Sequence, residues 1–218
     1  MKVVYIDGFK IRNTLDDDFG IIHQHSAGIG YYSPKFYIPQ GEWWIDRRYK
    51  KETEFLIQVE EYGATHPYKK INPHDTADKA RASLAALCAP PPVPRFEIKK
   101  KKSGRLIIVQ VDGSIVRRYL DPEFILGGHD LVYSYVPANT IWLDAHMDPR
   151  EMPYILLHEE TERRLMSQKE SYDFAHEIAT VTDKEARRRG CKAKYPGDAD
   201  YPWRGLSNQE ILKKYVSR

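Results

Sequence analysis

The chain has 218 residues, of which 41% are hydrophobic and 12% aromatic, so it carries enough apolar side chains to bury a substantial core. Its formal net charge is only +3, from 34 basic and 31 acidic residues. This near balance excludes the strong overall field with which very basic proteins attract nucleic acid or membrane surfaces.

Targeting signals are absent from the sequence pattern. No apolar run approaches the roughly 20 residues that a membrane span needs, and the N-terminus opens on a strand-like pattern instead of a signal peptide. The only cysteines, Cys88 and Cys191, are too few for a disulfide framework and fit a reducing compartment. We therefore expect a cytoplasmic protein that does not bind membranes.

The first predicted elements surround an Asp-Gly pair. Asp7-Gly8 separates two strand-like runs within residues 3–12, and Asp112-Gly113 does the same within residues 109–117. An Asp-Gly pair between two such runs is typical of a β-hairpin. The sequence thus predicts two hairpins of the same form.

These two stretches also resemble each other. Residues 4–19 and 109–124 align without gaps and share seven identities in sixteen positions. The identical pairs are Val4/Val109, Asp7/Asp112, Gly8/Gly113, Arg12/Arg117, Leu15/Leu120, Asp16/Asp121 and Phe19/Phe124. After an insertion in the first copy, a strand at 37–46 resembles one at 135–144. Such internal similarity indicates a repeated structural unit.

Two helices follow the strand in each copy. They are expected at about 51–62 and 75–87 in the first copy, and at 150–168 and 171–189 in the second. We predict an α+β fold built as a tandem duplication of a hairpin, strand, helix, helix unit. The expected domains are 1–88, the first repeat without a metal pattern; 89–105, a Pro-rich linker and basic hairpin tip; 106–191, the second repeat; and 192–218, a C-terminal loop and short helix.

The helix predicted at 150–168 combines helical periodicity with unusual polarity. Ile155, His158, Glu162 and Leu165 recur at the spacing of one buried helical stripe. A carboxylate in such a stripe is costly unless it is paired, hydrogen-bonded or bound to a cation. The first copy has Glu60 where the second has His158, so the fold itself does not require this histidine.

The residues in this stripe have the spacing of metal ligands. In His158-Glu159-x-x-Glu162, the side chains at i and i+4 point at one ion and the residue at i+1 lies beside it as a general base. His176 on the next helix is the expected third ligand, and Asp183 is either a fourth ligand or a carboxylate that orients a ligating histidine. The pattern predicts a zinc-type site with Glu159 as the catalytic base.

Two interpretations without an ion stay open. His158 and His176 can be core histidines satisfied by Glu162 and Asp183, as a buried polar network. The helix also contains two acid-before-base pairs of the kind found on solvated helix faces, namely Glu159 with Arg163 and Glu160 with Arg164.

Other polar clusters give weaker indications. Residues 99–102 are four lysines, which we expect, with Ser103, Gly104 and Arg105, at a hairpin tip. A solvated turn is favoured there over contact with nucleic-acid phosphates. Asp144 lies just before the predicted metal-binding helix, but Asp46 occupies the same place in the first copy, which favours a structural cap.

Residues 135–187 carry three motifs in succession: a Pro-x-x-x-Ile-Trp-Leu-Asp strand, a His-Glu-x-x-Glu helix and a Tyr-x-x-Ala-His-x-x-Ala helix. Together they resemble small uncharacterised proteins of phage, prophage and archaeal genomes, a resemblance that implies no particular activity. The His-Glu-x-x-Glu helix is also similar to a minimal zincin helix, with Glu162 in place of the second histidine. The zincin resemblance implies peptidase-like chemistry on a zinc ion.

The leading functional hypothesis is a divalent-metal protein, with zinc or another transition metal, that acts as a metal-dependent hydrolase on a substrate the sequence does not name. The competing hypothesis is a non-catalytic structural or binding module, in which the same residues form a structural metal site or a buried polar network. One version of this hypothesis associates the module with nucleic acid.

Overall fold

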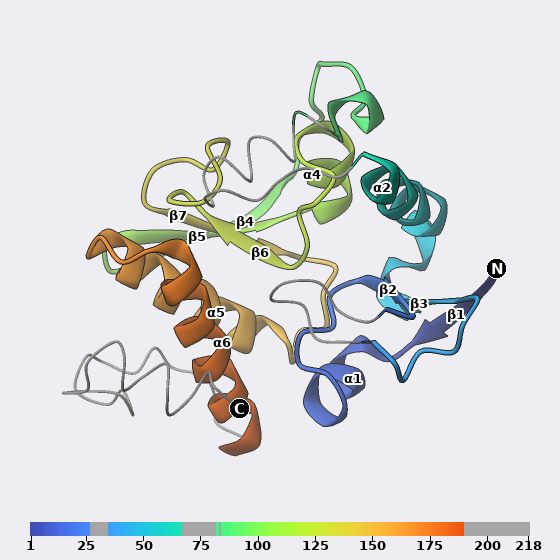
Figure 1. Ribbon diagram of the computed structural model, residues 1–218. Coiled ribbons are helices and arrows are strands. Elements are labelled where there is room, and N and C mark those ends of the chain that lie inside the picture. The colour runs from blue at the N-terminus through green and yellow to red at the C-terminus, as the bar shows by residue number, and fades with distance from the viewer. Residues whose placement is uncertain (27–34, 67–81, 83, 190–218) are drawn as a thin grey trace. The chain divides into compact units, whose positions relative to one another are not determined.

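The computed structural model describes residues 1–26, 35–66, 82 and 84–189 and has the mixed α+β architecture that the sequence predicts (Figure 1). The chain divides into two compact units, 1–152 and 153–218. These two units are defined by the compactness of the fold, whereas the domain boundaries predicted from the sequence are defined by the internal similarity. Across the described residues, no helix combines the length and apolar character needed to cross a membrane. The predicted helix 75–87 lies mostly outside the described residues, and the predicted C-terminal helix lies wholly outside them.

The first sheet belongs to the first unit and has the order β1-β3-β2. It consists of β1 (Lys2–Ile6), β2 (Ile22–Gln24) and β3 (Glu42–Asp46). β1 pairs with β3 in parallel and β2 pairs with it in antiparallel orientation. Helix α1 (Gly8–Thr14) connects β1 to β2, and β3 leads into the 3-10 helix η1 (Arg47–Glu52) and α2 (Thr53–Thr65).

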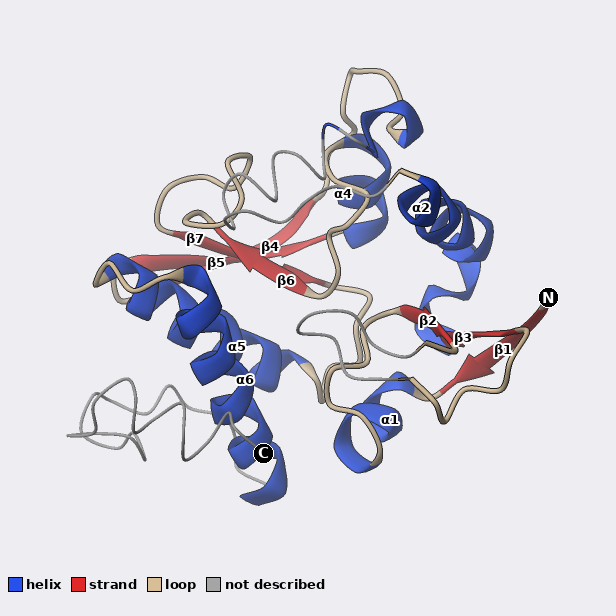
Figure 2. Cartoon of the chain, in the orientation of Figure 1, coloured by secondary structure: helices blue, strands red, loops and turns tan. Residues whose placement is uncertain are grey.

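The second sheet, in the same unit, has the order β4-β5-β7-β6 (Figure 2). Its strands are β4 (Glu97–Ser103), β5 (Leu106–Val111), β6 (Gly127–His129) and β7 (Thr140–Asp144), and α4 (Gly113–Tyr119) follows β5. β5 is parallel and β6 antiparallel to β7. The short 3-10 helix η2 (Ala85–Leu87) precedes this sheet along the chain.

Apart from β4, the two sheets repeat one arrangement. Asp46 ends β3 opposite Ile6 of β1, and Asp144 ends β7 opposite Val111 of β5. Arg12 binds the Asp46 carboxylate and the carbonyl oxygens of residues 19 and 20. The guanidinium of Arg117 binds the Asp144 carboxylate and the carbonyls of residues 124 and 125 in the same way.

The two predicted Asp-Gly hairpins are wrong. Asp7 and Asp112 are helix N-caps, whose side chains accept hydrogen bonds from the amides of Lys10 and of residues 114 and 115. The glycine after each Asp is required by close packing, because a Cβ at Gly113 would lie 2.0 Å from a carboxylate oxygen of Asp144. Each strand therefore continues into a helix instead of turning back.

The basic hairpin tip is also corrected. β4 and β5 do form an antiparallel hairpin, but Lys99–Lys102 lie within strand β4, and the turn is formed at Gly104, whose φ is 58°. Lysines are common on exposed edge strands, because their charge discourages pairing with another chain. The turn itself requires a left-handed backbone, which Gly104 adopts without steric cost.

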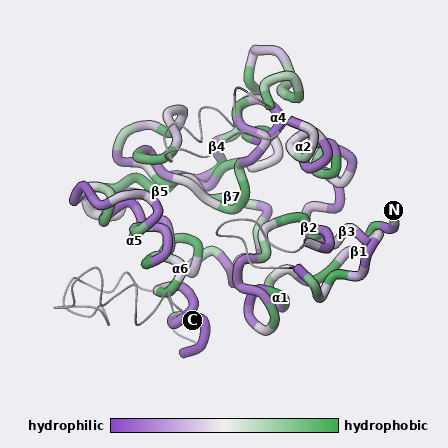
Figure 3. Tube along the Cα trace, viewed as in Figure 1, coloured by the Kyte–Doolittle hydropathy of each residue, from purple (hydrophilic) through white to green (hydrophobic). Residues whose placement is uncertain are grey.

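The core of the second sheet follows from its apolar strands. The sequence of β5, Leu-Ile-Ile-Val-Gln-Val, and that of β7, Thr-Ile-Trp-Leu-Asp, concentrate hydrophobic residues in the middle of the sheet (Figure 3). The buried cluster consists of Val109, Val111, Val116, Phe124, Val136 and Trp142. A sheet with such a core fixes the ends of its strands, where the Asp144 and Arg117 pair lies.

The described part of the second unit is formed by α5 (Met152–Ser167) and α6 (Tyr172–Arg189), close to the bounds predicted from the sequence. The two helices run side by side (Figure 1) and share a cluster of Leu165, Ala175 and Ile178. Lys169 in the connection has a φ of 69°, which allows a short reversal of the chain. An antiparallel pair of helices results.

Candidate metal centre

The candidate site lies between the facing surfaces of α5 and α6. His158 and Glu162 are four residues apart on α5 and therefore lie on one face. On α6, Ala175 and Ala179 are fully buried, and side chains this small let two helices approach closely. This approach brings His176 of α6 into contact with the two α5 residues.

Three atoms able to bind a metal converge at this point. Glu162 Oε2 lies 2.7 Å from Nδ1 of His176 and 3.5 Å from Nε2 of His158, and the two ring nitrogens are 3.3 Å apart. Metal–ligand bonds of about 2.0–2.1 Å in a tetrahedral zinc site place neighbouring ligand atoms ~3.4 Å apart. Two of the three separations already match this value, and the third is a hydrogen bond that an ion would open.

The three side chains differ in their access to solvent. The Glu162 side chain is 5% exposed and that of His158 14%, whereas His176 is 35% exposed. A site with a buried and a largely buried ligand on α5 and a more exposed one on α6 has both a dry side and an open side. This combination suits an ion that keeps a coordination position for water or substrate.

Asp183 contacts the opposite side of the His158 ring. Its Oδ2 lies 3.4 Å from Nδ1 of His158, while Nε2 of the same ring faces Glu162 and His176. Asp183 therefore does not point at the centre that the other three share. A carboxylate that accepts a hydrogen bond from the distal ring nitrogen fixes the ring and its tautomer.

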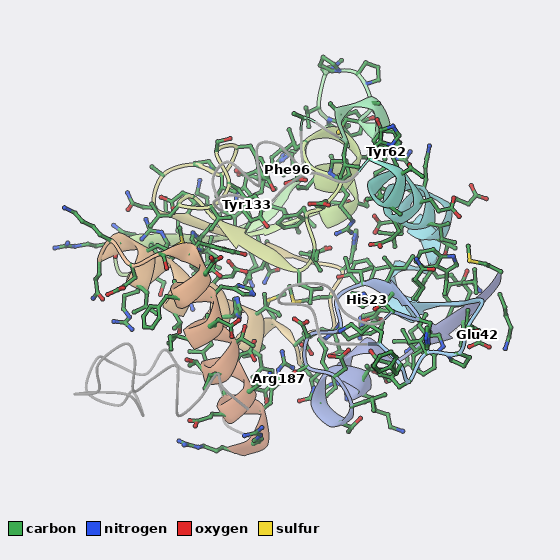
Figure 4. All side chains as sticks on the ribbon, in the orientation of Figure 1. His23, Glu42, Tyr62, Phe96, Tyr133 and Arg187 are labelled. Atoms are coloured by element: carbon green, nitrogen blue, oxygen red, sulfur yellow. The ribbon has the colours of Figure 1, made fainter. Side chains whose placement is uncertain are left out.

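Arg187 and Tyr154 extend this contact, and the sequence reasoning missed both. Arg187, on the C-terminal half of α6 (Figure 4), has its Nε 3.8 Å from Oδ1 of Asp183. Its guanidinium lies 4.6 Å from the centre of the Tyr154 ring on α5, a cation–π contact. The sequence could have predicted the contact between Arg187 and Asp183, because the two residues are four apart on the helix, the spacing of an ion pair on one face.

The charge state of His158 follows from its surroundings. Burial alone would lower the pKa of His158, but hydrogen bonds with Asp183 and Glu162 outweigh it and raise that pKa well above the ordinary value. The two carboxylates thus create a place where positive charge is favoured. Either a protonated imidazole or a divalent cation supplies the positive charge that the two carboxylates favour. The negative charge of the carboxylates is therefore compatible with a metal ion but does not require one.

Glu159 is buried on α5. One of its carboxylate oxygens lies within 4.8 Å of a Glu162 carboxylate oxygen. This separation is short enough for one water molecule to bridge the two groups by hydrogen bonds of about 2.8 Å each. The position is compatible with the general-base role that the sequence predicts, in which the carboxylate takes a proton from a metal-bound water.

Tyr172 at the start of α6 contacts the exposed ligand. Its ring stacks on that of His176, with centroids 5.3 Å apart and an interplanar angle of 21°. The ring of His158 meets that of His176 edge-on at 4.9 Å. His176 is therefore oriented from both sides, although it is the most exposed of the three candidate ligands.

The remaining polar clusters lie in the first unit. Asp144 accepts hydrogen bonds from the amides of His146 and Gly113 and binds Arg117, the structural type of role that the sequence favoured. The N-cap of η1 is Asp46, whose side chain accepts from Arg48 N. Neither aspartate belongs to the α5 and α6 cluster.

Comparison with known proteins adds no assignment to this geometry: no protein-family model, curated protein or solved structure matches the chain.

Proposed function

We propose that the pair of helices α5 and α6 binds one divalent transition-metal ion of the zinc type, with His158, Glu162 and His176 as ligands. The observation that carries this proposal is the convergence of their three ligand atoms within 2.7–3.5 Å of one another. Two imidazoles and one carboxylate are a ligand set that zinc enzymes use together with a bound water. Asp183 orients His158 from the second ring nitrogen.

Hydrolysis is the reaction that this arrangement favours. A divalent ion with an open position lowers the pKa of its bound water, and a nearby carboxylate removes the proton. Glu159 is the residue in place to do so, because it lies near Glu162 without being one of the three converging ligands. We infer a metal-dependent hydrolase with peptidase-like chemistry, and a cytoplasmic location is part of the same proposal.

Metal analysis of the purified protein tests the binding step. Elemental analysis of protein never exposed to a chelator is expected to give about one equivalent of a transition metal, and His176→Ala to remove it. His66→Ala is the matched control, because His66 is exposed at the end of α2. Less than about 0.2 equivalents in the unmodified protein would sink the proposal, since a preformed site of this kind binds tightly at neutral pH.

The catalytic step has a separate test. Glu159→Gln is expected to keep the metal content and fold while it abolishes hydrolysis of a peptide library by the metal-loaded protein. Glu177→Gln, on the neighbouring helix, is the control. Equal hydrolysis by the Glu159→Gln variant would rule out a general-base role for Glu159 while leaving metal binding intact.

A non-catalytic module is the second candidate, and the 2.7 Å hydrogen bond between His176 Nδ1 and Glu162 Oε2 favours it, because that contact satisfies the buried carboxylate without an ion. With a proton in place of the ion, His158 pairs with Glu162 and Asp183, and His176 with Glu162. The same residues would then stabilise the helix pair as a polar network or structural metal site. In that case, His176→Ala and chelator treatment lower the melting temperature, and no substrate is turned over.

We also propose that the chain contains a tandem duplication, now in the form of a strand, helix, strand, strand unit. Matching contacts support it: the Tyr37 hydroxyl donates to Asp16, and that of Tyr135 donates to Asp121. The same turn position has positive φ in both copies, at Gly41 and Asn139. Ion pairs also link the two copies: the buried pair of Arg12 with Glu151 and the partly buried pair of Arg117 with Glu52.

A further inference from the structure

Strand β4 carries a concentrated positive charge at the edge of the second sheet. Every residue from Glu97 to Ser103 is exposed, and among the described strands β4 pairs with β5 alone. Side chains alternate between the two faces of a strand, so Lys99 and Lys101 lie on one face and Lys100 and Lys102 on the other. We call these four lysines, together with Arg105 after the turn, the basic edge.

Among the described residues, no acidic side chain neutralises the lysines of the basic edge. None of the four forms an ion pair with another described residue, whereas Lys2 pairs with Glu42 and Lys35 with Asp16. The residues opposite them on β5 are all uncharged, namely Gln110, Val109, Ile108 and Ile107. Within the described part of the chain, their positive charge is exposed to solvent and has no acidic partner.

This charge exceeds what protection of an edge strand requires. One or two lysines are enough to discourage pairing with another chain, and neighbouring ammonium groups repel one another. Residues 97–105 contain five basic side chains and one acidic side chain. Their local excess is larger than the +3 charge of the whole protein, which points to an anionic partner.

We propose that the basic edge binds the phosphate backbone of a nucleic-acid duplex. β4 is paired on one side with β5, so its other side can approach the backbone of a duplex, and lysines on its two faces reach phosphates on either side of the strand. Phosphate contacts of this kind are strong in low salt and independent of base sequence. The basic edge thereby provides a local site on a protein whose overall charge is nearly balanced.

Two other polyanions fit the strand less well. Single strands are held by stacking on aromatic side chains, but β4 contains none, and the preceding Phe96 packs against Trp142 at 5.0 Å. An acidic peptide that added to the edge would need a regular ladder and side-chain pockets. The register shift between Glu97 and Lys99 interrupts the ladder.

Fluorescence anisotropy with a mixed-sequence 20-base-pair DNA duplex, and with the corresponding RNA duplex, tests this proposal at several salt concentrations. Contacts from all four lysines give a slope of about −3.6 for the logarithm of the binding constant of DNA against that of the salt concentration. The variants Lys99→Ser/Lys101→Ser and Lys100→Ser/Lys102→Ser are each expected to reduce its magnitude by about 1.8. The control Lys10→Ser/Lys51→Ser removes two exposed lysines elsewhere and leaves the slope unchanged.

Two results would overturn the proposal: an unchanged slope in both β4 variants, or complete displacement of the duplex by an equal charge concentration of polyglutamate. A change in only one variant would contradict contact through both faces. The RNA and DNA arms identify the duplex that binds more tightly, and circular dichroism verifies that each variant is folded. His176→Ala is expected to bind the duplex normally, so failure of the metal proposal is distinguishable from failure of this one.

Discussion

At the scale of single residues, the site depends on the two different nitrogens of His158. Nε2 faces Glu162 and His176, and Nδ1 faces Asp183. The sequence predicted these four residues from helical spacing but left open whether Asp183 is a ligand. Spacing places residues on one face of a helix and says nothing of which ring nitrogen each meets. That distinction depends on side-chain rotation.

The role of Asp183 leads to the first prediction. Asp183→Asn is expected to weaken zinc binding by about 10–100-fold without abolishing it, because an orienting carboxylate is lost while all three ligands remain. Competition with a chromogenic chelator measures the change. Asp173→Asn, at an exposed position in the first turn of α6, is the control. A loss as large as that of His176→Ala would indicate that Asp183 is itself a ligand.

His23 gives a prediction of pH dependence in the first unit. Burial, and then the charge of Lys35, lower the pKa of His23 to about 4, and its Nε2 accepts a hydrogen bond from Gly20 N. The unfolded chain, with the ordinary pKa of about 6.5, binds the proton first as the pH falls. This residue's contribution to stability is therefore present above pH 6.5 and is lost between pH 6.5 and 4.

The size of this effect follows from the same two pKa values. Between pH 7 and 5, the His23 contribution to the free energy of unfolding falls by about 2 kcal/mol. Urea unfolding of the native protein and of His23→Gln at both values measures it, because glutamine does not titrate. The stability difference between the two proteins should shrink or reverse at pH 5. An unchanged difference would show that His23 titrates normally in the folded protein.

At the scale of elements, the sequence predicted the long helices well and the short ones poorly. α5 and α6 are 16 and 18 residues long, enough for several turns of apolar periodicity. α1 and α4 have seven residues each, too few to show a period. The Asp-Gly signal marks the end of a strand equally well before a hairpin and before an N-capped helix, and tertiary contacts decide between them.

The close packing of α4 supplies a matched pair of substitutions. Gly113→Ala is expected to destabilise the protein by several kcal/mol, because the new Cβ would lie 2.0 Å from Asp144 Oδ2, itself held by Arg117. Gly63→Ala, in α2, meets nothing within 4 Å and should stabilise it by about 0.5–1 kcal/mol. Thermal melting measures both. Tolerance of Gly113→Ala would show that the strand and helix can separate without cost.

At the scale of the whole chain, the internal similarity was visible in the sequence, but the contacts of the matched residues were not. Seven identities between residues 4–19 and 109–124 identify equivalent positions, including Arg12 and Arg117. They do not reveal that each arginine binds both an aspartate that ends a strand of the nearby sheet and a glutamate far along the chain. Those partners lie up to 139 residues away from the arginine, beyond the reach of any local pattern.

The ion pairs Arg12–Glu151 and Arg117–Glu52 connect distant segments within the first unit, and breaking one of them tests their contribution to stability. Arg117 is 1% exposed and forms two hydrogen bonds with the Glu52 carboxylate. Glu52→Gln removes the charge that offsets a buried guanidinium and is expected to cost about 3–5 kcal/mol. Glu54→Gln, exposed two residues later in α2, should cost less than about 0.5 kcal/mol. Urea unfolding measures both values. If the two substitutions cost the same, the Asp144 carboxylate alone suffices for Arg117.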